Sequence, residues 1–438
     1  MGTGVGGRVS VATGASLGPG SVVAAAVGDK RRGGCYHRAP LSRSVAMIDL
    51  YNPTEEHGAL RQMVRDFAER EVGPQAAASD RAEHFNVELF RKLGDLGLLG
   101  LTVSEAYGGS GMDAVAAVIV HEELSAQDPG FALAYLAHSM LFANNFYHNA
   151  NDEQRRRVLP KVCSGQWIAG MGMSEPHAGT DALAMSTSAR RDGDDYVLNG
   201  AKMWITNGAI NDTELGDCFL IYAKTSDNRG RSLSSFLVEK GRPGFRLGQK
   251  IKDKLGMRAS PTAELVFEDC RIPVTNRLGL EGESTVHMMR NLELERLTLA
   301  AMSLGIARRC LEIMNQYATD RHAFGQSIRN FGQIQKYLGD SYAQWRAGRA
   351  YVYDTAARLS LESQGNRMDS DGVKLFCATM GKDIADNAIQ VLGGYGYVGE
   401  YQVERLWRDA KLLEIGGGTL EAHQKNITND LRRVGVLR

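Results

Sequence analysis

The sequence predicts an α+β fold in which a helical segment, a β-rich segment and a second helical segment follow one another. Hydrophobic residues recur at helical spacing from about residue 53 to 166 and again after Met288, and short β-branched runs separated by turns fill the part between them. Because helices and strands are not interleaved, this order argues against an alternating α/β sheet. We expect three domains, at residues 46–168, 169–285 and 286–438.

The first helical segment shows its period most clearly at Leu60, Val64 and Phe67 and again around Phe90. A glycine-rich stretch lies at residues 102–112. No buried parallel strand precedes it, so it does not match a dinucleotide-binding fingerprint and is interpreted as a loop between helices.

The middle segment contains four short apolar or β-branched runs separated by Asp-Gly, Asn-Gly and Arg-Pro-Gly turns. The runs are Tyr196–Leu198, Cys218–Tyr222, Ser235–Val238 and Ala263–Phe267. Their spacing predicts an antiparallel barrel or sandwich.

Composition excludes several classes of protein. The 51 basic and 51 acidic residues cancel, so no net positive field favours nucleic acid. The six cysteines are scattered and predict no metal site. No stretch approaches the roughly 18 to 20 apolar residues of a membrane span, so no integral membrane segment is expected.

Residues 1–45 are rich in glycine, alanine, serine and valine, and carry six basic residues against the single acid Asp29. This bias is typical of an organelle-import presequence and predicts delivery to the mitochondrial matrix. A disordered glycine-rich tail with no targeting role is the alternative.

One carboxylate lies in an apolar helical stripe. Glu295 follows Leu292 by three residues and precedes Leu299 by four, which predicts that it points inward, whereas Glu293 falls on the nearly opposite face. A desolvated carboxylate has a raised pKa, which suits a base that takes a proton from carbon. The alternative is a buried structural glutamate paired with Arg296 or Arg405.

Several motifs together resemble those of the acyl-CoA dehydrogenase family. The segments in question are MSEPHAGTD at 173–181, KMWITNG at 202–208, RHAFGQ at 321–326, QVLGGYGY at 390–397, RDAK at 408–411 and IGGGT at 415–419. They occur in the family's order, and the resemblance runs from about residue 50 to 435.

The resemblance implies a helical N-terminal domain, a middle antiparallel β-barrel and a C-terminal four-helix bundle, assembled as a homotetramer with FAD between domains and across a subunit interface. It also implies that a base removes the α-proton of an acyl-CoA while the β-hydrogen leaves as hydride to the flavin. An electron-transferring flavoprotein would then accept the electrons.

The resemblance also assigns residues by position. The expected FAD-binding residues are Met171, Gly172, Met173, Ser174, Gly179, Thr180, Trp204, Ile205, Thr206, Arg321, Phe324, Gln390, Gly393, Gly394, Thr419, Leu420 and Glu421. The expected substrate-binding residues are Thr180, Arg231, Glu293, Arg296, Gly416, Gly417 and Gly418. Gln390, Gly393 and Gly394 would act on the FAD of a neighbouring subunit.

At one position the sequence departs from most of the family. The usual base in a Tyr-Glu-Gly-Thr stretch is replaced by Gly417, and Glu414 lies three residues too early. The isovaleryl-CoA and long-chain subgroups instead place their base where Glu295 stands. Gly416 in place of a bulky tyrosine leaves width for a γ-branched chain, which favours isovaleryl-CoA as substrate.

Three alternatives stay open at this point: a long-chain acyl-CoA dehydrogenase, an inactive member acting as an assembly factor, and, less favoured, an oxidase. Two further departures affect fine contacts. Val286 stands where isovaleryl enzymes often have tyrosine, and Gly332 replaces a glutamine after Phe331, although Gln335 follows.

Overall fold

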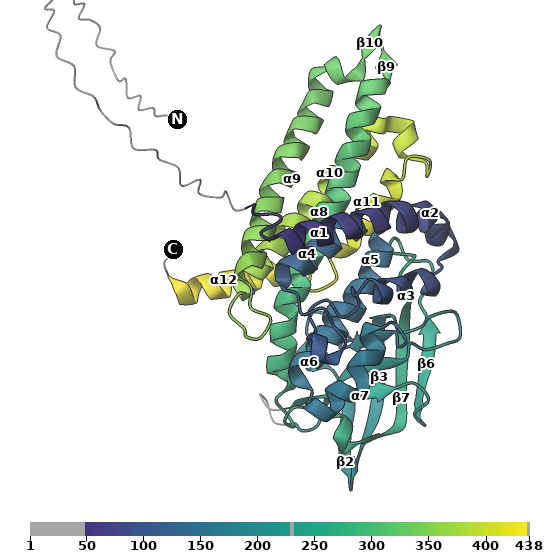
Figure 1. Ribbon diagram of the computed structural model, residues 1–438, viewed down its shortest axis with the longest axis vertical. Helices are drawn as coiled ribbons and strands as arrows, with labels where there is room; N and C mark the ends of the chain where they lie inside the picture. Colours follow the sequence, from purple (N-terminus) through teal and green to yellow (C-terminus); the bar gives the residue numbers. More distant parts are fainter. Residues whose placement is uncertain (1–48, 228–231, 436–438) are drawn as a thin grey trace, which may run out of the picture. The chain divides into compact units, whose positions relative to one another are not determined.

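A computed structural model describes residues 49–227 and 232–435. The predicted presequence at 1–45 and the predicted substrate residue Arg231 lie outside the described residues. Helices, a sheet and further helices follow one another along the chain, which confirms the predicted α+β order (Figure 1).

The first part is helical throughout. Its elements are α1 (Glu55–Phe67), the π-helix η1 (Ala68–Val72), α2 (Gly73–Ala82), α3 (Val87–Asp95), the 3-10 turn η2 (Glu105–Tyr107), α4 (Ala114–Ser125), α5 (Pro129–Leu136), the π-helix η3 (Ala137–Asn144), α6 (Asn145–Asn149) and α7 (Asp152–Cys163). Side-chain caps start several of these helices; at α7, Asn151 and Gln154 form a reciprocal capping box. The glycine-rich stretch at 102–112 is the loop between α3 and α4, as predicted.

The middle part forms one eight-stranded sheet. Its strands are β1 (Ala169–Gly172), β2 (Ser188–Asp192), β3 (Asp195–Thr206), β4 (Cys218–Lys224), β5 (Leu233–Glu239), β6 (Phe245–Lys250), β7 (Thr262–Pro273) and β8 (Arg277–Leu278), with 3-10 turns η4 (Ala182–Ala184) and η5 (Val274–Asn276). The order is β6-β7-β3-β2-β4-β5-β8, and β1 pairs with β4. Pairing is antiparallel except for β1 with β4 and one residue pair between β2 and β4.

The last part is dominated by three long helices. Its elements are α8 (Ser284–Asp320), β9 (His322–Ala323), β10 (Gln326–Ser327), η6 (Ile328–Asn330), α9 (Gly332–Arg358), α10 (Arg367–Leu392), η7 (Gly393–Gly396), α11 (Val403–Leu413) and α12 (Leu420–Val434). Figure 1 shows α8 extending from the sheet-containing part to the β9–β10 hairpin, with α9 and α10 beside it.

Helix α8 links the three parts because its middle is buried on every side. Residues 291–307 are all buried, and the apolar residues from Leu294 to Ala307 pack in one cluster with α1, α4 and α10. Met288 and Leu292, nearer its start, pack instead with β1 and β4. Any group on this stretch of α8 is therefore held between the helical core and the sheet. Among the described residues, no helix is both long and apolar enough to cross a membrane.

Candidate active site

Glu295 lies on α8 inside the protein, as the apolar stripe predicted. The residue is 7% exposed, with Leu292 and Leu299 buried one turn to either side. Its Oε2 has no hydrogen-bond partner among the described residues. Burial raises the pKa of Glu295 to about 7, against the opposing charges of Arg296 and Lys374. The carboxyl group is thus poised to exchange a proton near neutral pH.

Neither arginine considered as a structural partner neutralises Glu295. Arg296 Nη1 lies 3.1 Å from Asp371 Oδ1. Arg405 Nη1 lies 3.8 Å from Asp128 Oδ1 and 3.7 Å from an Asp409 oxygen. Both guanidinium groups therefore already face other carboxylates, which removes the main argument for a purely structural Glu295.

The glycine that replaces the family's usual base lies directly beside Glu295. A Cβ on Gly417 would stand 3.4 Å from Glu295 Oε1 and 2.3 Å from Leu299 Cδ1. Gly417 also has φ of 68°, a conformation that other residues rarely adopt. Positions 295 and 417, which are distant in sequence, are thus adjacent in space. A side chain at position 417 would displace Leu299. By contrast, the nearest atom to a Cβ placed on Gly416 would be Leu412 O, at 3.6 Å.

Glu293 is also buried, which the stripe argument did not predict. The residue is 5% exposed because the start of α10 covers the opposite face of α8. Its Oε2 accepts hydrogen bonds from the backbone N–H groups of Asn366 at 2.9 Å and Gly365 at 3.3 Å. The structure places this predicted substrate residue as a cap on the segment that leads into α10.

The two motif segments at 173–181 and 202–208 lie side by side. Met203 N donates to Ser174 O at 2.9 Å. Beneath them Lys202 Nζ donates to Glu175 Oε1 at 2.7 Å and to Met173 O at 3.2 Å. Glu175 also accepts from Ser186 N and Thr187 N.

This buried pair, Glu175 and Lys202, fixes the loop and was not among the predicted site residues. Contacts with Lys202, Ser186 and Thr187 outweigh burial and lower the pKa of Glu175 to about 2. Burial lowers the pKa of Lys202 to about 8. The signal was present, because both residues lie inside the two motifs, but only the fold shows that they meet.

Trp204 is an exposed aromatic residue at an irregularity in β3. The register of β3 shifts between Lys202 and Ile205, and Trp204 adopts φ of 65° there. Its side chain is 61% exposed, whereas Ile205 beside it is 3% exposed. A bulge that turns a large aromatic ring to the surface is a built feature.

The exposed loop before η4 carries two more of the predicted FAD residues. Gly179 and Thr180 are exposed, and no atom lies within 4 Å of a Cβ placed on Gly179. Thr206 and Ser174 are half-buried and carry hydroxyl groups. Together with Trp204 they offer an aromatic face and hydroxyl groups to a planar ligand.

The strand before this loop connects it to the helix that carries Glu295. Met171 and Met173 belong to the same apolar cluster as Met288 and Leu292 of α8. Gly172 is tightly enclosed, because a Cβ there would lie 2.5 Å from Ile221 Cδ1. Glu295 therefore lies one turn beyond a contact with the β1 strand.

The other predicted FAD residues gather elsewhere. Arg321 and Phe324 lie at the end of α8 and in the hairpin, where Phe324 is 95% exposed with φ of 52°. Gln390, Gly393 and Gly394 are exposed at the end of α10. This end of α10 lies near α8, because the ring centroids of Tyr395 and Tyr317 of α8 are 6.2 Å apart. No hydrogen bond or ion pair between described residues joins this group to the Trp204 segment.

The last motif begins α12. Thr419 caps the helix by accepting a hydrogen bond from Ala422 N at 3.3 Å. Leu420 is half-buried and Glu421 is exposed. Of the two departures, Val286 is 61% exposed and Gly332 opens α9 with free space around it, so neither disturbs the packing at Glu295.

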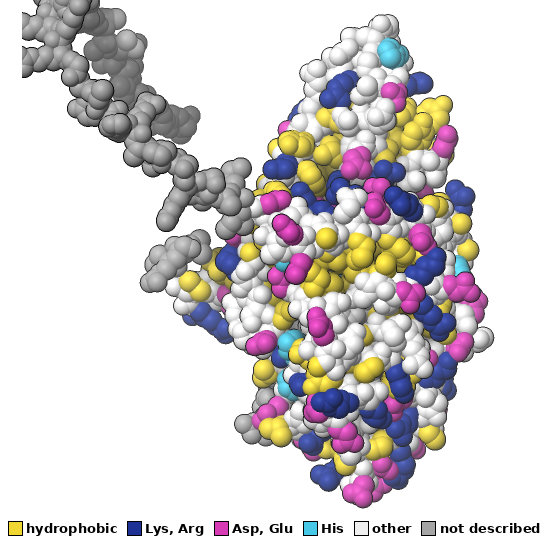
Figure 2. Space-filling view, in the orientation of Figure 1, with side chains coloured by type: hydrophobic (Ala, Val, Ile, Leu, Met, Phe, Trp, Pro, Cys, Tyr) yellow, Lys and Arg dark blue, Asp and Glu magenta, His cyan; other side chains and the backbone are white. Residues whose placement is uncertain are grey.

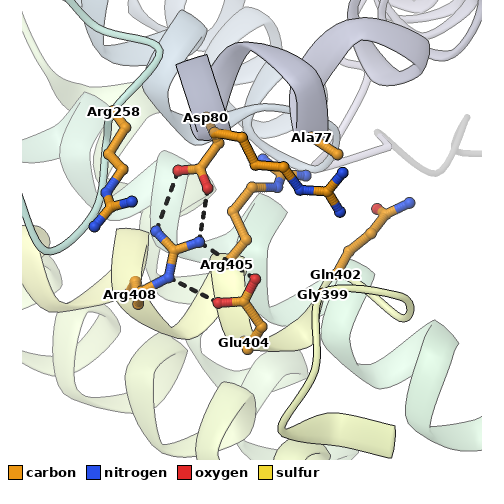
Figure 3. A pocket seen from close by; sticks show the side chains of 9 residues that line it. Ala77, Asp80, Arg258, Gly399, Gln402, Glu404, Arg405 and Arg408 are labelled. Atoms are coloured by element: carbon orange, nitrogen blue, oxygen red, sulfur yellow. Dashed lines mark hydrogen bonds and ion pairs between the residues drawn. The ribbon is translucent and has the colours of Figure 1, made fainter. Parts of the chain in front are cut away.

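A cavity of about 230 Å³ lies elsewhere, between α2 and α11 (Figure 3). Its charged lining is largely paired: Arg408 contacts both Asp80 and Glu404 at 2.7 Å. None of the predicted site residues lines it. We therefore place the candidate active site at Glu295 rather than in this cavity.

Comparison with known proteins agrees with this arrangement. The acyl-CoA dehydrogenase N-terminal, middle and C-terminal domain models match residues 54–166, 170–270 and 285–431. The chain belongs to the acyl-CoA dehydrogenase family. It is therefore an oxidoreductase acting on CH–CH donors.

Individual acyl-CoA dehydrogenases resemble it over most of their length. Mitochondrial isovaleryl-CoA dehydrogenase from Oryza sativa subsp. japonica is 41% identical over 87% of this chain and 92% of its own. The short-chain-specific acyl-CoA dehydrogenase of Clostridium acetobutylicum is 39% identical over 87% of this chain and 100% of its own. The structure of butyryl-CoA dehydrogenase from Megasphaera elsdenii matches with a TM-score of 0.83 and 33% identity, over 87% and 99% of the two chains.

Proposed function

We propose that the protein oxidises a short branched-chain acyl-CoA, isovaleryl-CoA, to 3-methylcrotonyl-CoA, as in leucine breakdown. One observation carries the proposal: Glu295, a buried carboxylate with no ion pair among the described residues, lies against the glycine that stands where most of the family has its base. In this role Glu295 takes the α-proton of the thioester. Backbone N–H groups of the Gly416–Thr419 segment would stabilise the negative charge that develops on the thioester oxygen.

The residues around Trp204 fit FAD. A ring displayed on a bulge, hydroxyl groups at Ser174 and Thr206, and an open glycine at 179 suit a flat isoalloxazine and its edge. Met171, Gly172, Ile205, Thr180 and the Thr419–Glu421 turn would complete the cradle. When bound, FAD supplies the acceptor for the β-hydrogen as hydride.

The exposed pair Arg321 and Phe324, with Gln390, Gly393 and Gly394, would hold the pyrophosphate and adenine ends of FAD across a subunit interface. An aromatic side chain that is 95% exposed supports burial by another subunit, and we propose a homotetramer. Figure 2 shows further hydrophobic side chains gathered on one face below α1 and α2.

The proposal also specifies which acyl chain the substrate carries. Space at Gly416 supports a γ-branched chain, and relatives named isovaleryl-CoA dehydrogenase support the same choice. Relatives named for short straight chains favour butyryl-CoA as the second candidate. We further propose an electron-transferring flavoprotein as acceptor, the mitochondrial matrix as location, and domains at 46–168, 169–285 and 286–438.

Anaerobic titration of the FAD-loaded protein with isovaleryl-, butyryl- and palmitoyl-CoA tests the proposal. Isovaleryl-CoA should bleach the flavin absorbance fastest and at the lowest concentration. Preference for butyryl-CoA would shift the substrate to a straight chain, and preference for palmitoyl-CoA would place the protein with the long-chain enzymes. Flavin that no acyl-CoA bleaches would favour an assembly role.

A further inference from the structure

The segment beside Glu295 has no side chains of its own to hold it. Gly416, Gly417 and Gly418 follow one another, and the last two have φ of 68° and 106°. Three glycines in succession leave a backbone with more conformational freedom than any other sequence. The position of the Gly417 backbone beside the Glu295 carboxylate must therefore be fixed from outside the segment.

Two buried side chains converge on one oxygen of this segment. Lys374 Nζ, on α10, donates to Gly418 O at 2.6 Å. His423 Nε2, on α12, lies 3.0 Å from the same oxygen. Both residues are fully buried. A carbonyl only accepts, so the contact with His423 requires a proton on Nε2.

The orientation of the His423 imidazole is fixed by Asp371, which also contacts Arg296. His423 Nδ1 lies 2.5 Å from Asp371 Oδ1, and the same carboxylate oxygen lies 3.1 Å from Arg296 Nη1. The ring also occupies the space next to the segment, because a Cβ on Gly418 would lie 2.9 Å from His423 Cε1. The chain Arg296–Asp371–His423 thus leads from α8, next to Glu295, through α10 and α12 to Gly418.

We propose that Lys374 and His423 are positioning residues that clamp the Gly418 carbonyl and thereby hold the Gly417 backbone in register with the Glu295 carboxylate. The effect on catalysis rests on the proposed function, whereas the clamp itself does not. The base and the donor to the thioester oxygen lie on different elements, α8 and the glycine segment. A displacement of one against the other by about 1 Å can lower a rate by about 100-fold.

The test compares His423→Leu, His423→Gln and Lys374→Met with Lys382→Met in the FAD-loaded, full-length protein. Lys382 lies two turns along α10 and pairs with Asp383 at 2.6 Å, so it controls for loss of a helix α10 lysine. Glutamine can still donate to Gly418 O, whereas leucine only fills space. Far-UV circular dichroism and FAD content establish that each variant is folded.

The first readout is hydrogen–deuterium exchange of the peptide that covers Gly416–Thr419. Because His423→Leu and Lys374→Met each remove one hydrogen bond to Gly418 O, each should speed exchange there by about fivefold, which corresponds to about 1 kcal/mol. His423→Gln should recover most of the protection, and Lys382→Met should match the unmodified protein. Unchanged exchange in both His423→Leu and Lys374→Met would overturn the clamp.

The second readout is turnover of isovaleryl-CoA. The clamp variants should lose about tenfold to 100-fold in kcat with little change in KM, because the segment acts on the reacting centre rather than on the bulk of the ligand. A loss confined to KM would overturn the positioning role. If the unmodified protein oxidises no acyl-CoA, the proposed function fails, but the exchange result still decides whether the clamp exists.

Discussion

Glu293 and Glu295 lie two residues apart on α8, and both are buried. Their carboxylates differ in hydrogen bonding. Glu293 accepts hydrogen bonds from two backbone N–H groups at the start of α10, whereas Glu295 Oε2 has no partner among the described residues. Burial raises the pKa of both carboxyl groups, that of Glu295 to about 7, and at Glu293 the hydrogen bonds from Asn366 and Gly365 oppose the rise. Hydrogen bonds offset part of the cost of burying the Glu293 carboxylate, and Glu295 Oε2 lacks such bonds.

The largest effect expected from this comparison is on turnover after Glu295→Gln. The amide keeps the shape of the side chain but cannot take a proton, so kcat should fall by at least about 1,000-fold, within the range for loss of a general base. Flavin bleaching by isovaleryl-CoA in a stopped-flow instrument measures it. FAD should stay bound, because no predicted FAD contact is removed.

Glu293→Gln is the matched control for that experiment, since it makes the same chemical change two residues away. Its rate of flavin bleaching should stay within about threefold of the unmodified protein, as expected for a group that does not touch the reacting atoms. Activity retained in Glu295→Gln would show that the base lies elsewhere and that the contrast between the two residues has no catalytic meaning.

The apolar stripe alone predicted that Glu295 points inward, and the structure confirms its burial; the missing family glutamate led to the same residue, whose catalytic role stays a prediction. Motif order also led to the right fold. The stripe failed for Glu293, since spacing on α8 cannot reveal that residues 365–366 come from far along the chain to cover the other face. A period describes one helix, but burial depends on what packs against it.

The partners of the glycine segment could not be predicted for the same reason. Lys374, Asp371 and His423 carry no local signal, and they meet only because α10 packs against both α11 and α12. Glu175 and Lys202 lay within recognised motifs, yet the pairing between them needed the β3 strand in place. The sequence predicted the buried carboxylate, and only the tertiary structure revealed the side chains that contact the glycine segment and the loop at 173–181.

A second effect, on stability, follows from the pKa of Glu295. The folded value of about 7 exceeds the ordinary 4.5, so below pH 4.5 the carboxyl is protonated in both folded and unfolded chains. Between these values the unfolded chain loses the proton while the folded protein keeps it, so rising pH favours unfolding. The loss levels off above pH 7 at as much as about 3 kcal/mol.

Glu295→Gln cannot titrate, so it isolates this contribution. Its free energy of unfolding should match that of the unmodified protein near pH 4.5 and exceed it by as much as about 3 kcal/mol at pH 8. Urea unfolding of both proteins at equal concentration and FAD loading measures the difference. A gap that does not widen with pH would mean that the Glu295 carboxyl is not desolvated.

The smaller of the two effects on stability is expected from Glu293→Ala, and it decides what that residue does. Removing the carboxylate leaves the backbone N–H groups of Gly365 and Asn366 without their acceptor, which should lower the free energy of unfolding by about 2 kcal/mol. If the carboxylate only caps α10, KM for isovaleryl-CoA should stay within about threefold. A KM raised more than tenfold with unchanged stability would instead make Glu293 a substrate contact, and the two carboxylates would then differ by which part of the ligand each meets.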